Sequence, residues 1–343
     1  MAYDIVVYDS SRKQAVLELQ KLHWGGDIDR NRLYFDWKYE RNPWLTPPRI
    51  RLAYDRDKLI GMLGAYGSCW ELGNLRHPPR CASLGDAVVD PKYRRQGIFQ
   101  SLARALTADL RRDSFDYVIS TSANHVTFRA LSQLAHQAST RGPLLQARGW
   151  SRPWLWVANM LAKGTFGPKA GAVIERAPRI EEMTKLVARL TSDDRYRHCR
   201  DPEFYRWRFR NPSCRYRFLY ICRPQLRGYL VVQEWDGGPQ PKRMHNLVDW
   251  AAESDGVLVE LLGTARRMIS TRRFRVWHTG DDSRCAAALA ANGFRLTTGE
   301  PRGPAVLISY LHDSNPFRRC FIDGRDPRDI ANWDLRQIDS DFY

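Results

Sequence analysis

Apolar residues alternate with polar residues along several stretches of the chain, and elsewhere they recur every three or four positions. Alternation predicts strands and the longer spacing predicts amphipathic helices. In the first half the pattern predicts strands at residues 4–8, 49–54, 59–67, 82–89 and 117–121, and helices at 11–22, 33–41, 98–112 and 126–135. In the second half it predicts strands at residues 218–222, 228–234 and 274–278, and helices at 180–190 and 256–270. A mixed α/β fold is therefore expected.

Several phrases recur in the same order in the two halves. "FDWKYERNP" at residues 35–43 is similar to "FYRWRFRNP" at residues 204–212, and in both halves an arginine-rich strand and a glycine-containing strand follow. Aromatic residues at helical spacing before Asn-Pro are typical of a core and a helix end, so these phrases are interpreted as structural. Chance would explain any single match, but the kept order favours a duplication.

A longer match supports the same interpretation. The sequence beginning at Ala87 can be laid without gaps on the sequence beginning at Asn246, which places Asp90 opposite Asp249 and Gly97 opposite Gly256. Each half is also expected to close on a Gly-aromatic pair, at residues 149–150 and 293–294.

The stretch between the halves suggests where two domains meet. Residues 162–172 are rich in Gly, Lys and Pro, as linkers often are. Domains at residues 1–165 and 166–343 are therefore expected, and the C-terminal tail at residues 332–343 is expected to fray.

Composition restricts the partners and the location of the chain. The 343 residues carry a formal net charge of +16, which would attract a nucleic acid or a small phosphorylated ligand equally well. No apolar run is long enough to span a membrane, and the N-terminus lacks the features of a signal peptide, so a cytoplasmic protein is expected. The seven cysteines are never spaced C-x-x-C, which argues against a disulfide framework and against a metal site.

The junction "VVDPKYRRQGIF" at residues 88–99 joins a predicted strand to a predicted helix. The start of a helix has unpaired backbone N–H groups and a partial positive charge, and therefore favours an anion such as phosphate. Arg94 and Arg95 add charged donors, while Gly97 allows close backbone approach. Neither the P-loop pattern nor the dinucleotide-binding pattern is present, so a different phosphate site is expected. The alternative is an ordinary glycine-broken turn before a surface helix.

This junction resembles motif A of the GNAT acyltransferase superfamily, [RQ]-x-x-G-x-[GA]. The resemblance implies two tandem GNAT-like domains, each a mixed, mostly antiparallel twisted sheet flanked by helices. It also implies that acetyl-CoA or another acyl-CoA binds the first domain. The implied cofactor-binding residues are Ala87, Val88, Val89, Arg94, Arg95, Gln96, Gly97, Ile98, Phe99 and Asn124. Phe99 departs from the motif and would either crowd the pyrophosphate or pack inward.

The second half has acids at the matching turn. Glu253, Ser254 and Asp255 precede Gly256, and carboxylates would repel a pyrophosphate. The second domain is therefore expected not to bind CoA, which leaves one active site in the chain.

Candidate catalytic residues follow from the same resemblance. Asp86 stands where many GNAT enzymes have an acid on the strand, and it is a candidate base. Alternatively, it is a strand acid that forms a cap or a salt bridge with a neighbouring arginine. Asn124 matches an Asn that contacts the cofactor, although it would also serve as a helix cap. His125 and Ser132 are weaker candidates, and no residue is assigned as the general acid.

These observations predict an acyl-CoA-dependent N-acyltransferase, by default an N-acetyltransferase that uses acetyl-CoA. The expected acceptor is a primary amine of a small molecule or of an amino sugar or glycan precursor. A non-catalytic acyl-CoA sensor or scaffold is one alternative, and a nucleic-acid-binding protein is the less favoured one. The sequence leaves the acceptor, the acyl chain length and the oligomeric state open.

Overall fold

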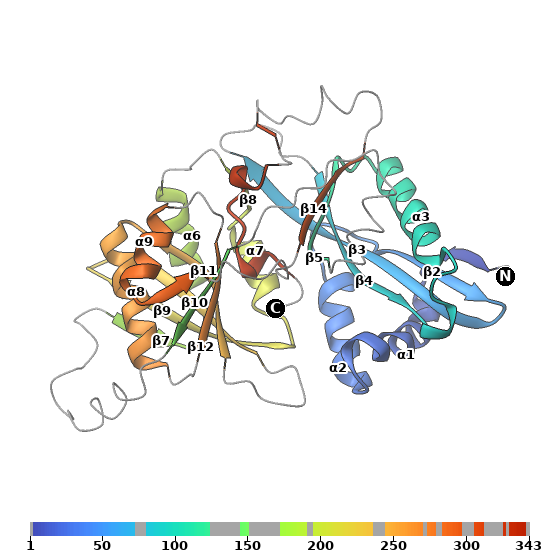
Figure 1. Ribbon diagram of the computed structural model, residues 1–343, viewed down its shortest axis with the longest axis horizontal. Coiled ribbons are helices and arrows are strands. Elements are labelled where there is room, and N and C mark those ends of the chain that lie inside the picture. The colour runs from blue at the N-terminus through green and yellow to red at the C-terminus, as the bar shows by residue number, and fades with distance from the viewer. Residues whose placement is uncertain are drawn as a thin grey trace.

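Two mixed sheets, each covered by helices, form the two lobes of the computed structural model (Figure 1). The structure describes residues 3–72, 80–123, 145–150, 172–190, 195–235, 244–269, 273–278, 283–296, 305–311, 325–326 and 329–340. This architecture confirms the predicted fold class of two mixed α/β units in tandem.

The first sheet has seven strands, with the order β1-β2-β3-β4-β5-β14 and with β8 paired to the far end of β3. These strands are β1 (Asp4–Val7), β2 (Arg49–Asp55), β3 (Lys58–Leu72), β4 (Arg80–Val89), β5 (Tyr117–Ala123), β8 (Tyr196–His198) and β14 (Ala305–Tyr310). Among the strands that the structure describes in this sheet, only β4 and β5 are parallel neighbours, and every other pair is antiparallel.

The second sheet also has seven strands, in the order β13-β6-β12-β11-β10-β9-β7. They are β6 (Leu145–Trp150), β7 (Ala172–Glu175), β9 (Cys214–Cys222), β10 (Leu226–Trp235), β11 (Met244–Ala252), β12 (Arg273–His278) and β13 (Phe294–Leu296). Here β11 and β12 are the parallel pair, which repeats the plan of the first sheet.

The sheets exchange strands, which the sequence did not predict. β14, from the C-terminal half, pairs with β5 and lies as a red strand among the blue and teal elements of the first lobe (Figure 1). β6, which carries Gly149 and Trp150, pairs with β12 and β13 of the second sheet. Both predicted closing pairs therefore lie in one sheet, and neither half of the chain completes its own sheet. The predicted linker lies outside the described residues except for Ala172, the first residue of β7.

Helices cover the sheets according to their apolar spacing. In the first lobe these are α1 (Lys13–Trp24), α2 (Ile28–Phe35), a π-helical turn η2 (Asp36–Glu40) and α3 (Ile98–Arg112). In the second lobe they are α6 (Ile180–Arg189), α7 (Pro202–Arg208), α8 (Asp255–Met268) and α9 (Ser283–Ala291). α3 buries Ile98, Leu102, Leu106 and Leu110, one residue per turn, against the first sheet. Each such burial contributes about 2 kcal/mol.

The repeated aromatic phrases form the contact between the units. Trp37 and Trp207 stack with ring centroids 4.8 Å apart. The indole N–H of each donates to the backbone carbonyl of the other, at 2.8 and 2.9 Å, as in a two-fold contact. The π-helical turn holds the one extra residue between Trp37 and Asn42 compared with Trp207 and Asn211. The structural interpretation of these phrases is confirmed.

The C-terminal segment is buried at the junction of the two lobes, so the prediction of a fraying tail is wrong for residues 332–340. Trp333, Leu335 and Ile338 are each no more than 3% exposed. The Trp333 ring contacts the rings of Tyr196 and Trp70 at 4.7 and 5.2 Å. Residues 337–340 are all buried as well, although the composition of the segment is largely polar. Residues 341–343 lie outside the described residues.

Candidate functional site

The parallel strands β4 and β5 separate before their ends. They pair only from Cys81 to Ser83 of β4, although β4 continues to Val89. The other edge of β4 pairs with β3 as far as Val89. Beyond Ser83, the β4 edge toward β5 therefore has backbone groups that the sheet does not use, and an extended ligand can bind them.

The turn after β4 begins with a capped 3₁₀ turn. Asp90 accepts a hydrogen bond from the Lys92 amide at 3.0 Å and forms an ion pair with Lys58 at 2.7 Å. The Lys58 ammonium and the Lys92 amide lower the pKa of Asp90 below its usual range. Asp90 therefore stays ionised and holds the turn η3 (Pro91–Tyr93) that leads into the candidate site.

The predicted phosphate site has two residues in the left-handed region. Arg95 has φ 65° and Gly97, the N-cap of α3, has φ 78°. A Cβ on Gly97 would have no heavy atom closer than the Tyr3 hydroxyl at 4.0 Å, so backbone conformation and not crowding requires glycine here. Arg94, Arg95, Gln96 and Gly97 are all exposed.

The start of α3 is open to an anion. No side chain caps this helix, and its first turn has no acid. Its first N–H groups therefore point at solvent beside Arg94 and Arg95. Phe99 is half-buried and packs on the apolar cluster between α3 and the sheet. Of the two alternatives for Phe99, the structure has the inward-packed one.

The second unit has a shorter turn in the same place. A Cβ on Gly61 would meet Ile98 of α3, and a Cβ on Gly228 would meet Val257 of α8. Gly61 pairs with Val89, and Gly228 pairs with Ala252. The second unit therefore lacks a counterpart of residues 90–93.

The missing turn changes the alignment of the two halves. Opposite Asp249 stands Asp86, so the ungapped match of Asp90 with Asp249 is wrong. The match of Gly97 with Gly256 remains valid when the two halves are aligned by α3 and α8, because both glycines lie at the start of these helices. Gly256, however, lies inside α8 and is not among the glycines with positive φ.

The start of α8 is already occupied by its own side chains. Ser254 accepts a hydrogen bond from the Val257 amide at 3.4 Å, and Asp255 stands in the first turn. Glu253 forms ion pairs with Arg189 and Arg227, which lower its pKa. This helix start offers a phosphate fewer donors and a repulsive charge.

Asp86 lies on the bulged part of β4 with φ 53°, an unusual backbone for a residue other than glycine. Its carboxylate is fully buried and accepts hydrogen bonds from Gln20 at 3.0 Å, Trp24 at 3.2 Å and Lys38 at 3.1 Å. The Lys38 ammonium is equally buried and lies 5.2–5.6 Å from the centres of three tyrosine rings. The structure therefore pairs Asp86 with a lysine, where the sequence suggested an arginine.

The sequence analysis missed these partners of Asp86. Lys38 lies inside the repeated aromatic phrase, and its only signal was a lone cation between aromatic residues. Gln20 and Trp24 come from α1, and no local pattern connects them with β4. Asn124, His125 and Ser132 lie outside the described residues.

Asp249 has a matching but larger network. It is fully buried and accepts hydrogen bonds from Arg200 at 3.2 Å, Arg336 at 3.1 Å and Tyr229 at 2.9 Å. Burial opposes the charge of Arg200, but the carboxylates of Asp339 and Asp249 outweigh it and raise the arginine pKa. Both units therefore hold a buried acid on the strand before the turn.

Two further properties concern the described part of the chain. None of its helices is long and apolar enough to cross a membrane. Among those residues, no group of three or more His, Cys, Asp or Glu side chains is placed to bind a metal ion.

Comparison with known proteins agrees with this geometry. Residues 7–128 match the family described as acetyltransferase (GNAT) domain. A direct comparison of the sequence with curated proteins finds no match.

Solved structures resemble the whole chain in fold. A probable N-acyltransferase from Enterococcus faecalis has a TM-score of 0.62 at 10% identity, covering 91% of this chain and 73% of its own. A tandem GNAT protein from the clavulanic acid biosynthesis pathway has a TM-score of 0.58 at 14% identity, covering 92% and 100%. N-myristoyltransferase from Saccharomyces cerevisiae, solved with bound myristoyl-CoA and inhibitors, has a TM-score of 0.60 at 11% identity, covering 97% and 86%.

Proposed function

Because residues 7–128 are an acetyltransferase domain of the GNAT superfamily and the whole chain has a tandem GNAT fold, we propose that it is an acyl-CoA-dependent N-acyltransferase. The default donor is acetyl-CoA, and the acceptor is a primary amine of a small molecule or glycan precursor. The single observation that carries this proposal is the uncapped, acid-free start of α3 beside a strand edge left unpaired by β5.

The residues of the first unit suit the parts of acyl-CoA. The amides of Arg95 to Phe99 would bind the pyrophosphate, with the Arg94 and Arg95 side chains adding charge. The free edge of β4 near Ala87, Val88 and Val89 would bind the pantetheine arm. Asn124 is proposed to contact that arm as well.

When bound, acyl-CoA would supply a thioester whose carbonyl carbon accepts the neutral amine. The C–N bond forms, the C–S bond breaks, and CoA leaves as a thiol with the proton that the amine loses. Backbone N–H groups at the bulge of β4 would stabilise the carbonyl oxygen as negative charge develops. To act as a base, Asp86 would have to exchange its lysine partner for the substrate ammonium. The buried pair therefore favours a positioning role, in which Asp86 and Lys38 hold the bulge against α1.

The second unit is proposed to have no acyl-CoA site. Ser254 and Asp255 occupy the helix start that Arg95 and Gln96 leave open in the first unit. One active site per chain follows.

Calorimetric titration of acetyl-CoA tests the proposal, followed by thiol release with a panel of primary amines. The wild type is expected to bind at one site, and Gly97→Glu is expected to weaken binding at least about 100-fold through repulsion and backbone strain. Gly256→Glu is the matched control because this glycine is also exposed at a helix start, and it should bind as the wild type does. Circular dichroism verifies that both variants fold.

The outcomes separate the alternatives. Binding with no turnover against any amine would support the sensor alternative. If neither acetyl-CoA nor longer acyl-CoAs bind the wild type, the acyltransferase proposal fails.

A further inference from the structure

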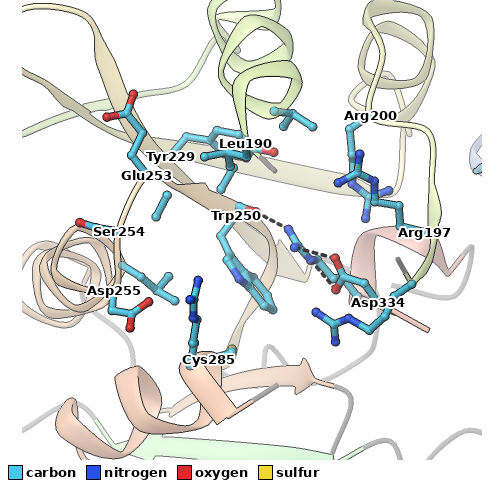
Figure 2. Close-up of a pocket in the computed structure, with 17 residues that line it drawn as sticks. Leu190, Arg197, Arg200, Tyr229, Trp250, Glu253, Ser254, Asp255, Cys285 and Asp334 are labelled. Atoms are coloured by element: carbon cyan, nitrogen blue, oxygen red, sulfur yellow. Dashed lines mark hydrogen bonds and ion pairs between the residues drawn. The ribbon is translucent and has the colours of Figure 1, made fainter. Parts of the chain in front are cut away.

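A cavity of about 270 Å³ opens in the second unit (Figure 2). β11 and β12 pair only from Met244 to Leu247, and the cavity is lined by Trp250, Ala251 and Ala252 further along β11. The first unit separates its parallel strands in the same way. The cavity therefore occupies the place in the second unit where the first unit has its proposed acyl-CoA site.

The cavity does not suit acyl-CoA. Its helix start is capped by Ser254 and carries Asp255, and the turn of residues 90–93 has no counterpart. A pyrophosphate would meet an acid where the first unit has free amides. Another ligand chemistry is needed to explain an open cavity here.

One wall of the cavity is apolar. Val187 and Leu190 come from the end of α6, and Leu258 comes from α8. In Figure 2 the Trp250 indole lies in the middle of the lining, with Ser254 and Asp255 on one side and Arg200 and Asp334 on the other. An apolar ligand body can bury itself between these side chains.

The remaining lining is rich in arginine. Five guanidinium groups and three carboxylates line the cavity: Arg195, Arg197, Arg200, Arg284, Arg336, Glu253, Asp255 and Asp334. Because guanidinium groups outnumber carboxylates, the lining has a net positive charge, which favours an anionic ligand group over a cationic one.

Most of these charges are paired within the protein. Asp334 pairs with Arg336 at 2.8 Å, and the Arg336 guanidinium also lies over the Trp250 ring at 4.5 Å. Glu253 is held by two arginines outside the cavity. Arg284, at the exposed start of α9, has no ion pair or hydrogen bond with any residue that the structure describes. It is the cation available to a ligand.

We propose that this cavity binds a small organic acid, with its carboxylate on Arg284 and its apolar body against Trp250, Leu190 and Leu258. Arg197 and Arg200 belong to the segment that joins the lobes, and Arg336 belongs to the buried C-terminal segment. The ligand therefore lies beside the segments that hold the two lobes together, and we expect it to stabilise their junction. This site is independent of the proposed acyl-CoA site.

Calorimetry on the full chain tests this with phenylacetate, indole-3-acetate and octanoate as probes and phenylacetamide as the uncharged control. At least one acid is expected to bind at a single site, to raise the melting temperature and to bind at least tenfold more tightly than the amide. Saturating acetyl-CoA and the Gly97→Glu substitution should leave this binding unchanged.

Variants then locate the site. Arg284→Gln is expected to weaken binding about tenfold or more, and Leu190→Glu to abolish it by placing a carboxylate in the apolar wall. Arg295→Gln removes another exposed arginine, on β13 and outside the cavity, and should have no effect. The proposal is overturned if no acid binds at millimolar concentration, if the amide binds equally well, or if Arg295→Gln weakens binding as much as Arg284→Gln.

Discussion

The two units share a strand order, a buried acid on the bulged strand and a strand pair that separates, yet they differ at one turn. The first unit runs through residues 90–97 before α3, and the helix start is open with Gly97 at φ 78°. The second unit runs through residues 253–254 before α8, and Ser254 caps the helix. The same fold therefore presents an uncapped helix start in one unit and a capped helix start in the other. We expect this turn, more than the sheet, to set which ligand each unit binds.

The buried acids also differ in how their charge is balanced. Asp86 has one cation, Lys38, whereas Asp249 has two, Arg200 and Arg336. Loss of one cation should therefore affect the two units unequally.

The largest expected effect follows from removing Lys38. Lys38→Met leaves the Asp86 carboxylate buried without a counter-charge, which is expected to cost about 3–5 kcal/mol of unfolding free energy. Urea unfolding measures it, and Lys38→Met with Asp86→Asn should recover a large part. Arg336→Met combined with Asp334→Asn, which removes the other carboxylate that Arg336 pairs with, should cost less because Arg200 still faces Asp249. Lys21→Met, at an exposed pair with Glu18, is the control and should change stability by less than about 0.5 kcal/mol. Equal losses at Lys38 and Arg336 would contradict the comparison.

A second test links the two halves of the chain through two thiols. Cys69 of β3 and Cys199, next to β8, are opposite each other, with sulfur atoms 2.6 Å apart and a backbone hydrogen bond of 2.9 Å. Hydrogen peroxide is expected to oxidise both thiols to one disulfide while it is reduced to two water molecules. The disulfide should raise the free energy of unfolding by about 2–4 kcal/mol. Mass spectrometry under non-reducing conditions detects it, and Cys69→Ser should remove both the link and the gain in stability. Persistence of both free thiols under peroxide would count against this prediction.

The junction should also respond to pH through His198. This histidine is 3% exposed, and burial, followed by the nearby positive charge of Arg200, lowers its pKa to about 3. The unfolded chain takes up this proton below about pH 6.5, whereas the folded protein does not. The contribution of His198 to the free energy of unfolding is therefore fully present above pH 6.5 and is lost as the pH falls toward 3. Between pH 7 and pH 5 the loss is about 2 kcal/mol. Chemical unfolding at pH 7 and pH 5 should show a smaller change in the free energy of unfolding for His198→Phe than for the wild type. His23→Phe, at an exposed histidine, should show the same change as the wild type. An unchanged difference in His198→Phe would rule out this assignment.

The smallest expected effect tests the turn itself. Gln96→Glu gives the first unit the charge that Asp255 gives the second, and it should weaken acetyl-CoA binding about fivefold, or about 1 kcal/mol. Asp255→Gln is the reverse change in the second unit and should leave acetyl-CoA affinity unaltered. Calorimetric titration of both variants compares the turns directly, and tighter binding by Gln96→Glu would refute the assigned role of this turn.

Local patterns in the sequence were sufficient for much of this molecule. The spacing of Ile98, Leu102 and Leu106 predicted α3, because helix periodicity depends on neighbouring residues. The anion site at the turn with Gly97, and the absence of an acyl-CoA site beside Glu253 and Asp255, stay predictions.

The tertiary structure alone decided the rest. The exchange of β6 and β14 between the sheets depends on which free strand edges meet, and both edges have similar alternating sequences. The partner of Asp86 is Lys38, which lies far away in the chain and reaches it only when α1 and η2 pack on β4. The burial of Trp333 and Leu335 depends on an aromatic cluster that exists only between the folded lobes. The sequence by itself determined where each unit has its elements and its charged turn, because those are local properties. Strand pairing, burial and counter-charges required the fold, because they join residues that lie far apart in the chain.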